Sequence, residues 1–370
     1  MDQEYKPILS EEERAARRAQ RAASRRKKQR ERRLRLLRRL FPCLLLALLG
    51  GGLLTAGAKL IYKPEAEPAK AARPARLADD AGPSLPEPYA RAASTADTVQ
   101  LGAELSSTHA VVIDLETRSV LAEKDPDAVI SPASMTKILT ALVAAEHITE
   151  ADLDQAFTMT IDITDYCYVN GCSVVGLMVG ETVSVRELFY GTILPSGADA
   201  ALGLATYVAG SQEAFVALMN EKASALGMAH TSFANPNGLD ADGHYSTARD
   251  MAVLGAAAVE NPTFRRICSS RSVTIGQRTM ENHNRLLRQV EGCVGLKTGY
   301  TQAAGRTLVS CTERDGCRLV AVTLQDGNDW ADHAALYDYG FRLTAPRRGV
   351  QTALLRLREP LTAACAALHS

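Results

Sequence analysis

The sequence predicts a mixed α/β (α+β) domain in which one sheet is built from the two ends of a segment and helices occupy its middle. Apolar runs of strand length occur near residue 110 and again between about 272 and 324, and the residues between them carry apolar positions at helical spacing. Strands from both ends of a segment can pair in one sheet that the intervening helices cover. With 46% hydrophobic residues, the 370-residue chain can bury a sizeable core.

The expected elements follow one another as two strands, five helices, four strands and a final helix. They lie at 110–113 and 119–122 (strands), 134–146, 184–194, 197–209, 211–226 and 247–259 (helices), 272–276, 294–298, 306–312 and 317–324 (strands), and about 330–343 (helix). The first helix has apolar residues on almost every side, which predicts that it is buried. The residues Asn235-Pro236-Asn237-Gly238 predict a loop.

The N-terminus predicts a membrane anchor. The basic tail 1–39 holds fourteen Lys or Arg from Arg14 onward with a single acid among them, and an uncharged apolar stretch follows over 40–58. As a helix this stretch would span about 28 Å, close to the hydrocarbon thickness of a bilayer, so we expect a transmembrane signal-anchor over 40–62. The charge predicts a single-pass protein of the cell membrane with a cytoplasmic N-terminus and an extracellular remainder. Secretion after signal cleavage near Ala56-Gly57-Ala58 is the alternative.

The rest of the chain is expected to divide into three parts. Residues 63–99 are rich in Pro, Ala and charge and predict a disordered linker, residues 100–346 form the folded domain, and residues 347–370 form a short tail. Because the excess of positive charge lies in the N-terminal tail and not in the folded domain, we do not expect binding to nucleic acid.

The eight cysteines form no C-x-x-C pair of the kind that is typical of zinc sites, so no metal is expected. Outside the membrane, disulfides are allowed. Cys311 and Cys317 flank an Asp-Gly turn, and Cys167 and Cys172 flank Asn170-Gly171, so each pair is a candidate disulfide. For either pair, unpaired thiols that fill space as small apolar residues are an equally supported alternative.

The first motif that carries chemistry is Ser134-Met135-Thr136-Lys137. Because Pro132 disfavours helix before it, we expect a helix to begin close to Ser134, and residues three apart on a helix face the same way. A hydroxyl needs a neighbouring base to act as a nucleophile, and a lysine with a lowered pKa can be that base. On its own the motif is weak, since a helix cap followed by a surface lysine gives the same pattern.

Two further motifs follow along the chain. Ser196 lies between two helical segments, and Lys297-Thr298-Gly299 continues an expected strand into Tyr300. A lysine and a threonine are suited to bind the anionic end of a substrate, and a glycine allows a close approach of the backbone. Each motif is weak alone, because a serine before a helix is usually an N-cap and Lys-Thr-Gly fits an ordinary strand and turn.

The order of the three motifs and the residues around them resemble the low-molecular-weight penicillin-binding proteins, the serine D-alanyl-D-alanine carboxypeptidases of peptidase family S11. The resembling stretches are Pro132 to Lys137, Asn235 to Leu239 with His244 to Ala248, and Lys297 to Thr301 with Ala304 to Arg306. The resemblance covers about residues 100 to 345. It implies the DD-peptidase/β-lactamase-like fold, with an antiparallel sheet flanked by helices and an all-helical subdomain.

The resemblance also implies a hydrolase of the cell wall that removes the terminal D-alanine from peptidoglycan stem peptides through an acyl-enzyme. The implied residues are the nucleophile Ser134, its base Lys137, the proton relay Ser196, and the substrate-binding Lys297, Thr298, Gly299 and Tyr300. The backbone N–H groups of Ser134 and Tyr300 would form an oxyanion hole. β-Lactam antibiotics would acylate the same serine, and no metal or organic cofactor is implied.

One residue departs from the family pattern. The second motif normally ends in Asn, and this chain has Ala198. Either water or another side chain fills the gap and the enzyme is active, or turnover is weak and the protein mainly binds the wall. Losing one polar contact costs about 1–3 kcal/mol, which favours activity and predicts faster acylation in Ala198→Asn. A D,D-endopeptidase acting on cross-links, with the same residues, is a further alternative.

Overall fold

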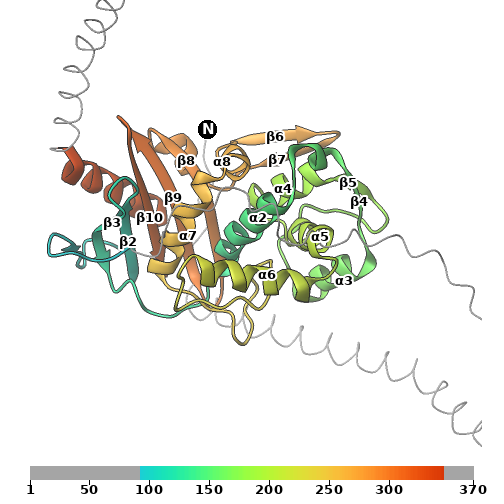
Figure 1. Cartoon of the computed structure of the whole chain (residues 1–370), viewed down its shortest axis with the longest axis horizontal. Coiled ribbons are helices and arrows are strands. Elements are labelled where there is room, and N and C mark those ends of the chain that lie inside the picture. Colours follow the sequence, from blue (N-terminus) through green and yellow to red (C-terminus); the bar gives the residue numbers. More distant parts are fainter. Residues whose placement is uncertain (1–91, 346–370) are drawn as a thin grey trace, which may run out of the picture. The chain divides into compact units, whose positions relative to one another are not determined.

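The computed structural model describes residues 92–345, which fold around a six-stranded sheet (Figure 1). The strand order is β1-β3-β2-β10-β9-β8. Neighbouring strands are antiparallel except for β1 and β3, which run parallel. The strands of this sheet are β1 (Val99–Gln100), β2 (His109–Asp114), β3 (Ser119–Lys124), β8 (Cys293–Thr301), β9 (Gly305–Arg314) and β10 (Cys317–Leu324).

The two ends of the described chain meet in the middle of this sheet. Strand β2 pairs with β10, with Val111 opposite Val322. All six residues of β2 are buried, because both faces of the sheet are covered. Alternate residues reach the two cores, Val111 on one face and Val112 on the other. The prediction of one sheet built from both ends of the segment is confirmed.

Helices cover both faces of the sheet. Helices α2 and α7 contribute to the core on one face, and a helix over residues 329–345 packs on the other. The labelled helices are η1 (Ala133–Met135), α2 (Thr136–His147), η2 (Glu150–Asp154), α3 (Ile161–Asn170), α4 (Val185–Ile193), α5 (Ala198–Ala209), α6 (Gln212–Ala225), α7 (Ala248–Glu260), α8 (Pro262–Cys268) and α9 (Leu286–Gln289).

A buried polar cluster fixes the helix over 329–345 against the sheet. The two ring nitrogens of His333 lie 2.7 Å from Ser310 Oγ and 3.0 Å from Thr323 Oγ1, and the hydroxyl of Tyr337 also bonds Ser310. Burial lowers the pKa of His333 to about 3, so the ring is neutral at physiological pH. Buried polar groups that are mutually satisfied in this way define one packing arrangement.

Helices α3 to α6 lie together on the side of α2 that is remote from the sheet (Figure 1). This helical part also contains a two-stranded sheet, β4 (Ala156–Thr158) with β5 (Thr182–Ser184). A second pair, β6 (Ser272–Ile275) with β7 (Arg278–Glu281), lies nearby in Figure 1. The prediction of an all-helical subdomain is therefore wrong in detail, because this part also contains the strands β4 and β5. The strands β4 and β5 are too short to show an alternating pattern in the sequence.

Helix α3 was not expected from the sequence, because its apolar residues do not recur at helical spacing and only Ile163 and Cys167 are buried. It ends at Gly171, whose φ of 63° is the left-handed conformation that favours glycine at a helix end. The backbone N–H of Cys172 then donates to the carbonyl of Cys167 at 3.0 Å. This bond is the one that closes a Schellman motif, which brings the side chains at these two positions together.

The six cysteines within residues 92–345 are all free thiols. In the β9–β10 hairpin Cys311 lies opposite Val320, and Cys317 lies opposite Arg314. The two cysteines belong to the cores on opposite faces of the sheet, so the predicted disulfide between them is wrong. Cys167 and Cys172 are also unbridged, and a hydrogen bond between their side chains lowers the pKa of Cys172.

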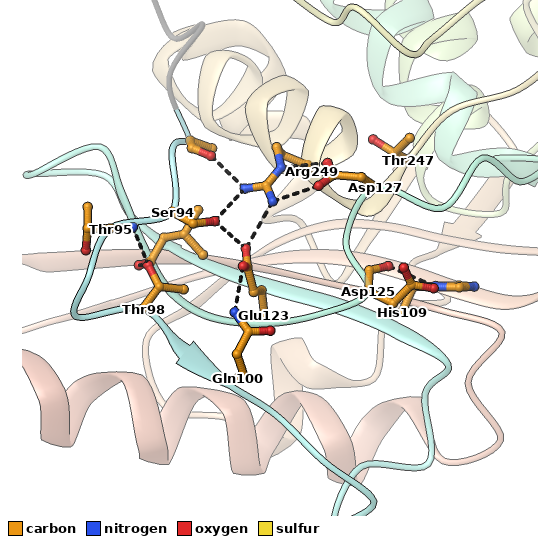
Figure 2. A network of polar contacts seen from close by, with 12 residues as sticks. Ser94, Thr95, Thr98, Gln100, His109, Glu123, Asp125, Asp127, Thr247 and Arg249 are labelled. Atoms are coloured by element: carbon orange, nitrogen blue, oxygen red, sulfur yellow. Dashed lines mark hydrogen bonds and ion pairs between the residues drawn. The ribbon is translucent and has the colours of Figure 1, made fainter.

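The first described residues are fixed to the domain by a network around Arg249, on α7 (Figure 2). The guanidinium donates to Asp127 at 2.7 and 2.9 Å, to Glu123 at 3.0 Å, to Ser94 at 3.2 Å and to the carbonyl of Ala92 at 2.9 Å. Residues 92–99, which the sequence assigns to the linker, thus pack against the domain.

The expected basic tail, the signal-anchor and the linker up to residue 91 lie outside the described residues, as does the tail from residue 346. Within residues 92–345, none of the helices has the length and apolar character that crossing a bilayer requires.

The Arg249 network predicts a stability effect. Arg249→Met leaves Glu123, whose side chain is 9% exposed, without its cationic partner, and we expect the free energy of unfolding to fall by about 2–3 kcal/mol. The matched control is Arg186→Met, whose partners Glu150 and Asp154 are 61% and 76% exposed, with an expected loss below about 1 kcal/mol. Urea unfolding of the three proteins measures both; equal losses would contradict a special role of Arg249.

Candidate active site

Ser134 lies in the short turn η1, directly before α2. The turn passes into the helix, and the three-residue spacing places Lys137 on the same side as Ser134. The Nζ atom of Lys137 lies 2.9 Å from Ser134 Oγ, in hydrogen-bonding contact. The contact that the spacing predicts is therefore present, and it is local to a single stretch of chain.

Lys137 is 2% exposed, and its amine also donates to the backbone carbonyl of Asn237 at 2.5 Å. Burial lowers the pKa of Lys137 from 10.5 to about 8, and the neighbouring groups Cys172, Cys167 and Asp199 counteract only part of this shift. A measurable fraction of the amine is therefore neutral near pH 7. A neutral amine can accept the Ser134 hydroxyl proton while one of its own N–H groups still bonds Asn237.

The loop 235–238 packs against the residues around Ser134 and Lys137. Gly238 has a φ of 83°, and a Cβ atom on it would lie 2.1 Å from the carbonyl oxygen of Ala133. Only glycine allows this approach, which brings the Asn237 carbonyl to Lys137. Sequence reasoning identified the loop but not this contact, because a backbone carbonyl has no signature in residue type.

Ser196 lies in the connection between α4 and α5, and it lines the same cleft as Ser134. Its φ of 62° is in the left-handed region. The N-cap of α5 is Gly197, so a capping role does not account for the serine. Two backbone bonds hold the connection, Gly197 N to Gly191 O at 2.8 Å and Ala198 N to Ser173 O at 2.7 Å.

Lys297 and Thr298 lie on β8, the edge strand of the sheet. Lys297 is 1% exposed, and its Nζ donates to the carbonyl of Thr298 at 2.7 Å. Burial, together with the positive charge of Lys137 nearby, lowers the pKa of Lys297 well below its usual range. The two lysines are therefore close enough to interact electrostatically, although they come from a helix and a strand far apart in the sequence.

Gly299 brings the edge of β8 against the backbone of Ser134. A Cβ atom at Gly299 would lie 3.0 Å from Ser134 N and 2.5 Å from Thr307 Oγ1, so a side chain there would force the strand away. Tyr300 follows and is 69% exposed at the cleft.

Backbone strain coincides with the three motifs. Ala133, directly before Ser134, has a φ of 49°. Ser196, in the second motif, has a φ of 62°, and Leu296, directly before Lys297, has a φ of 107°. A residue other than glycine held in such a conformation costs about 1–3 kcal/mol, and residues of this kind gather at functional sites. Each of the three motifs thus has a strained residue in it or directly before it, and the other positive-φ residues that are not glycine within residues 92–345 are Arg118, Asp125, Asp315 and Gln325.

One cleft of about 700 Å³ collects the predicted site residues. The residues among them that line it are Ser134, Ser196, Thr298, Gly299 and Tyr300. Lys137 and Lys297 are buried behind this surface and reach it through their contacts with Ser134 and Thr298. The structure therefore brings all seven predicted residues to one place.

His244 stabilises the site through hydrogen bonds. Its Nδ1 accepts the backbone N–H of Ala234 at 3.0 Å, and its Nε2 lies 2.9 Å from Thr136 Oγ1. Burial lowers the pKa of His244 to about 4, so the neutral ring donates from Nε2. The hydroxyl of Thr136 donates onward to the carbonyl of Ala133 at 2.8 Å. His244 thus holds the turn that carries Ser134.

Asp199 is a structural residue of the site that the sequence analysis missed. Its carboxylate accepts the backbone N–H groups of Val175, Gly176 and Leu177 at 2.9 to 3.0 Å. This fixes the loop after α3, whose Ser173 lines the cleft. An acid in the first turn of a helix is the signal that was available, but it does not identify the loop that is bound.

Ala198, which replaces the family asparagine, is 3% exposed and belongs to the apolar core. The titratable neighbours of Lys137 that raise its pKa are Cys172, Cys167 and Asp199. The alanine is thus packed in the apolar core and is not among the residues that line the cleft.

Known proteins of one family are similar to this chain over most of the described residues. The family model described as peptidase S11, D-alanyl-D-alanine carboxypeptidase, matches residues 93–328. D-Alanyl-D-alanine carboxypeptidase DacC of Escherichia coli is 38% identical over 241 residues, which are 63% of this chain and 60% of that protein. DacB2 of Mycobacterium tuberculosis is 38% identical over 245 residues, 63% of this chain and 81% of that protein.

A solved structure is similar over the same region. The crystal structure of a Streptomyces DD-transpeptidase superposes with a TM-score of 0.61 at 30% sequence identity, covering 64% of this chain and 98% of that one. The chain spans only 60% of the length of DacC, so the similarity concerns the domain that carries the cleft. On the match over residues 93–328, the chain belongs to the D-alanyl-D-alanine carboxypeptidase family, peptidase S11.

Proposed function

We propose that this protein is a serine D-alanyl-D-alanine carboxypeptidase that removes the terminal D-alanine from peptidoglycan stem peptides and is acylated by β-lactams. The observation that carries the proposal is the 2.9 Å contact between Ser134 Oγ and the Nζ of a buried lysine whose pKa is lowered to about 8. A serine and a deprotonated lysine in contact at the edge of a cleft form an activated nucleophile.

In the acylation step, Lys137 accepts the hydroxyl proton while Ser134 Oγ attacks the carbonyl between the last two D-alanines. The backbone N–H groups of Ser134 and Tyr300 are proposed to bind the developing oxyanion, and such a donor typically contributes about 3–4 kcal/mol. The close approach that Gly299 allows between β8 and the backbone of Ser134 supports this arrangement.

Ser196 is proposed to pass the proton to the nitrogen of the leaving D-alanine, because it lies in the same cleft. The terminal carboxylate would lie against Thr298, with Lys297 beneath it. An anion bound there would favour the charged form of Lys297 and offset part of its burial cost. Water then releases the acyl group from Ser134, with Lys137 available as the base.

The positive charge and apolar stretch over residues 1–62 support a further part of the proposal, that the protein is held in the cell membrane with its catalytic domain, residues 100–346, outside. On this proposal residues 63–99 connect the anchor to the domain, and residues 347–370 form a short tail.

Loss of the nucleophile or of its base tests the proposal directly. We expect Ser134→Ala to abolish labelling by a fluorescent penicillin and to reduce D-alanine release from a pentapeptide at least about a thousandfold. Lys137→Arg, which keeps the charge but cannot deprotonate, should lose at least about a hundredfold in acylation. Lys222→Arg is the control, since Lys222 pairs with Glu146 and does not line the cleft. Normal D-alanine release by Ser134→Ala would refute the proposal.

The pKa of Lys137 predicts a pH dependence. Only the deprotonated amine can accept a proton, so the acylation rate should rise about tenfold per pH unit below the pKa and level off above about pH 8. Stopped-flow labelling with a fluorescent penicillin between pH 5.5 and pH 9.5 measures the profile. Melting temperatures over the same range separate changes in rate from unfolding. A rate that is flat from pH 6 to pH 9 would exclude Lys137 as the base.

The burial of Ala198 predicts a result opposite to the one that the sequence alone favours. Asparagine is larger, and forcing it into a packed site costs about 1–3 kcal/mol. We therefore expect Ala198→Asn to lower the melting temperature and to slow acylation by a β-lactam, with Ala198→Ser as the smaller polar control. Faster acylation in Ala198→Asn would show that the site accepts the family residue without adjustment.

A further inference from the structure

The cleft extends well beyond the groups that act on the scissile bond. Its volume of about 700 Å³ lies in the range of sites that enclose ligands much larger than a single amino acid. Besides the proposed catalytic and carboxylate-binding residues, its wall contains Arg285, Arg288, Arg306 and Trp330. These residues have no part in the mechanism above.

The charges of this wall are not balanced. Arg306 is neutralised, because its guanidinium donates to both carboxylate oxygens of Asp329 at 2.6 and 2.8 Å. Arg285 and Arg288 are exposed and have no ion pair within residues 92–345. The other carboxylate of the wall is that of Glu281, so one positive charge remains uncompensated even when Glu281 is counted.

Trp330 orders part of this wall. The guanidinium carbons of Arg285 and Arg306 lie 5.9 and 5.8 Å from the centroid of its ring, within the distance at which a cation and an aromatic ring attract. A guanidinium held against a ring loses less conformational freedom when it binds an anion than one on a freely moving side chain. Arg285 is therefore ordered and available to bind an anionic ligand. Arg306 is not, because it is already paired with Asp329.

The wall lies on the leaving-group side of the proposed reaction. Arg306 is directly opposite Tyr300 in the β8–β9 register, and Thr298 is two residues before Tyr300, so all three project from the same face of the sheet. The backbone N–H of His283 donates to the carbonyl of Leu194, so the chain that leads to Arg285 runs beside the approach to Ser196.

We propose that Arg285 and Arg288 form an anion subsite for a second carboxylate on the leaving residue, in addition to the terminal carboxylate at Thr298. The substrate class would then include stem peptides in which the leaving residue is a dicarboxylic amino acid. The reaction is the same hydrolysis: the amide bond breaks, the acyl group passes to Ser134 and then to water, and the proton goes to the leaving amine. This inference rests on the proposed function.

The test uses two synthetic substrates with the same N-acyl-D-alanyl donor. One carries D-glutamate as the leaving residue and the other carries D-glutamine, which has nearly the same shape without the side-chain charge. In 20 mM salt we expect kcat/KM for the glutamate substrate to exceed that for the glutamine substrate by about fivefold, and the ratio should decrease in 500 mM salt. In the double variant Arg285→Ala/Arg288→Ala the ratio should fall to about one.

Charge-preserving and distant substitutions complete the test. The double variant Arg285→Lys/Arg288→Lys should retain most of the ratio, because it keeps the charge. Arg342→Ala removes an exposed arginine twelve residues further along the helix from Trp330 and should leave the ratio and the D-alanine release unchanged. Melting temperatures show that each variant is folded.

The outcomes separate this inference from the proposed function. A ratio of one in the wild-type protein, or a ratio that survives the double alanine substitution, overturns the anion subsite while D-alanine release from a pentapeptide continues. No release from any of the three substrates by the folded wild-type protein overturns the proposed function itself.

Discussion

The burial of two lysines in one place is the constraint on which the rest of the site depends. Removing an ammonium group from water costs several kcal/mol, so a buried lysine tends to lose its proton. Lys137 and Lys297 are 2% and 1% exposed, and the charge of Lys137 makes the charged form of Lys297 less favourable. The buried surroundings of α2, the loop 235–238 and the edge of β8 therefore set the protonation of the site as well as its shape.

Much of the fold could be predicted because it depends on periodic patterns. The strands β2, β3, β8, β9 and β10 of the central sheet and the helices α4 to α7 lie within a few residues of the expected ranges, whereas the edge strand β1 was not predicted. The contact between Ser134 and Lys137 is predictable for a different reason, since three residues on a helix fix it locally. The convergence of Ser196 and Lys297 on the same cleft has no such local cause, and only the family resemblance suggested it.

What the sequence did not predict depends on tertiary contacts or on backbone atoms. The apolar residues of helix α3 do not recur at helical spacing, and the register that separates Cys311 from Cys317 is not visible in their spacing. The carbonyl of Asn237 bonds Lys137 through a backbone group, which residue identity does not specify. Arg249 binds residues 92 and 94 from a helix more than 150 positions away, and no short motif encodes such a contact.

The left-handed conformations at Ala133, Ser196 and Leu296 limit how this protein can be made more robust. Glycine adopts a positive φ without steric cost, so replacing Ala133 with glycine would relieve the strain there. Yet the same change would widen the set of conformations open to the turn before Ser134, and a nucleophile must be held to within about half an ångström of its productive position. Selection for heat resistance and selection for turnover would therefore favour different amino acids at these three positions.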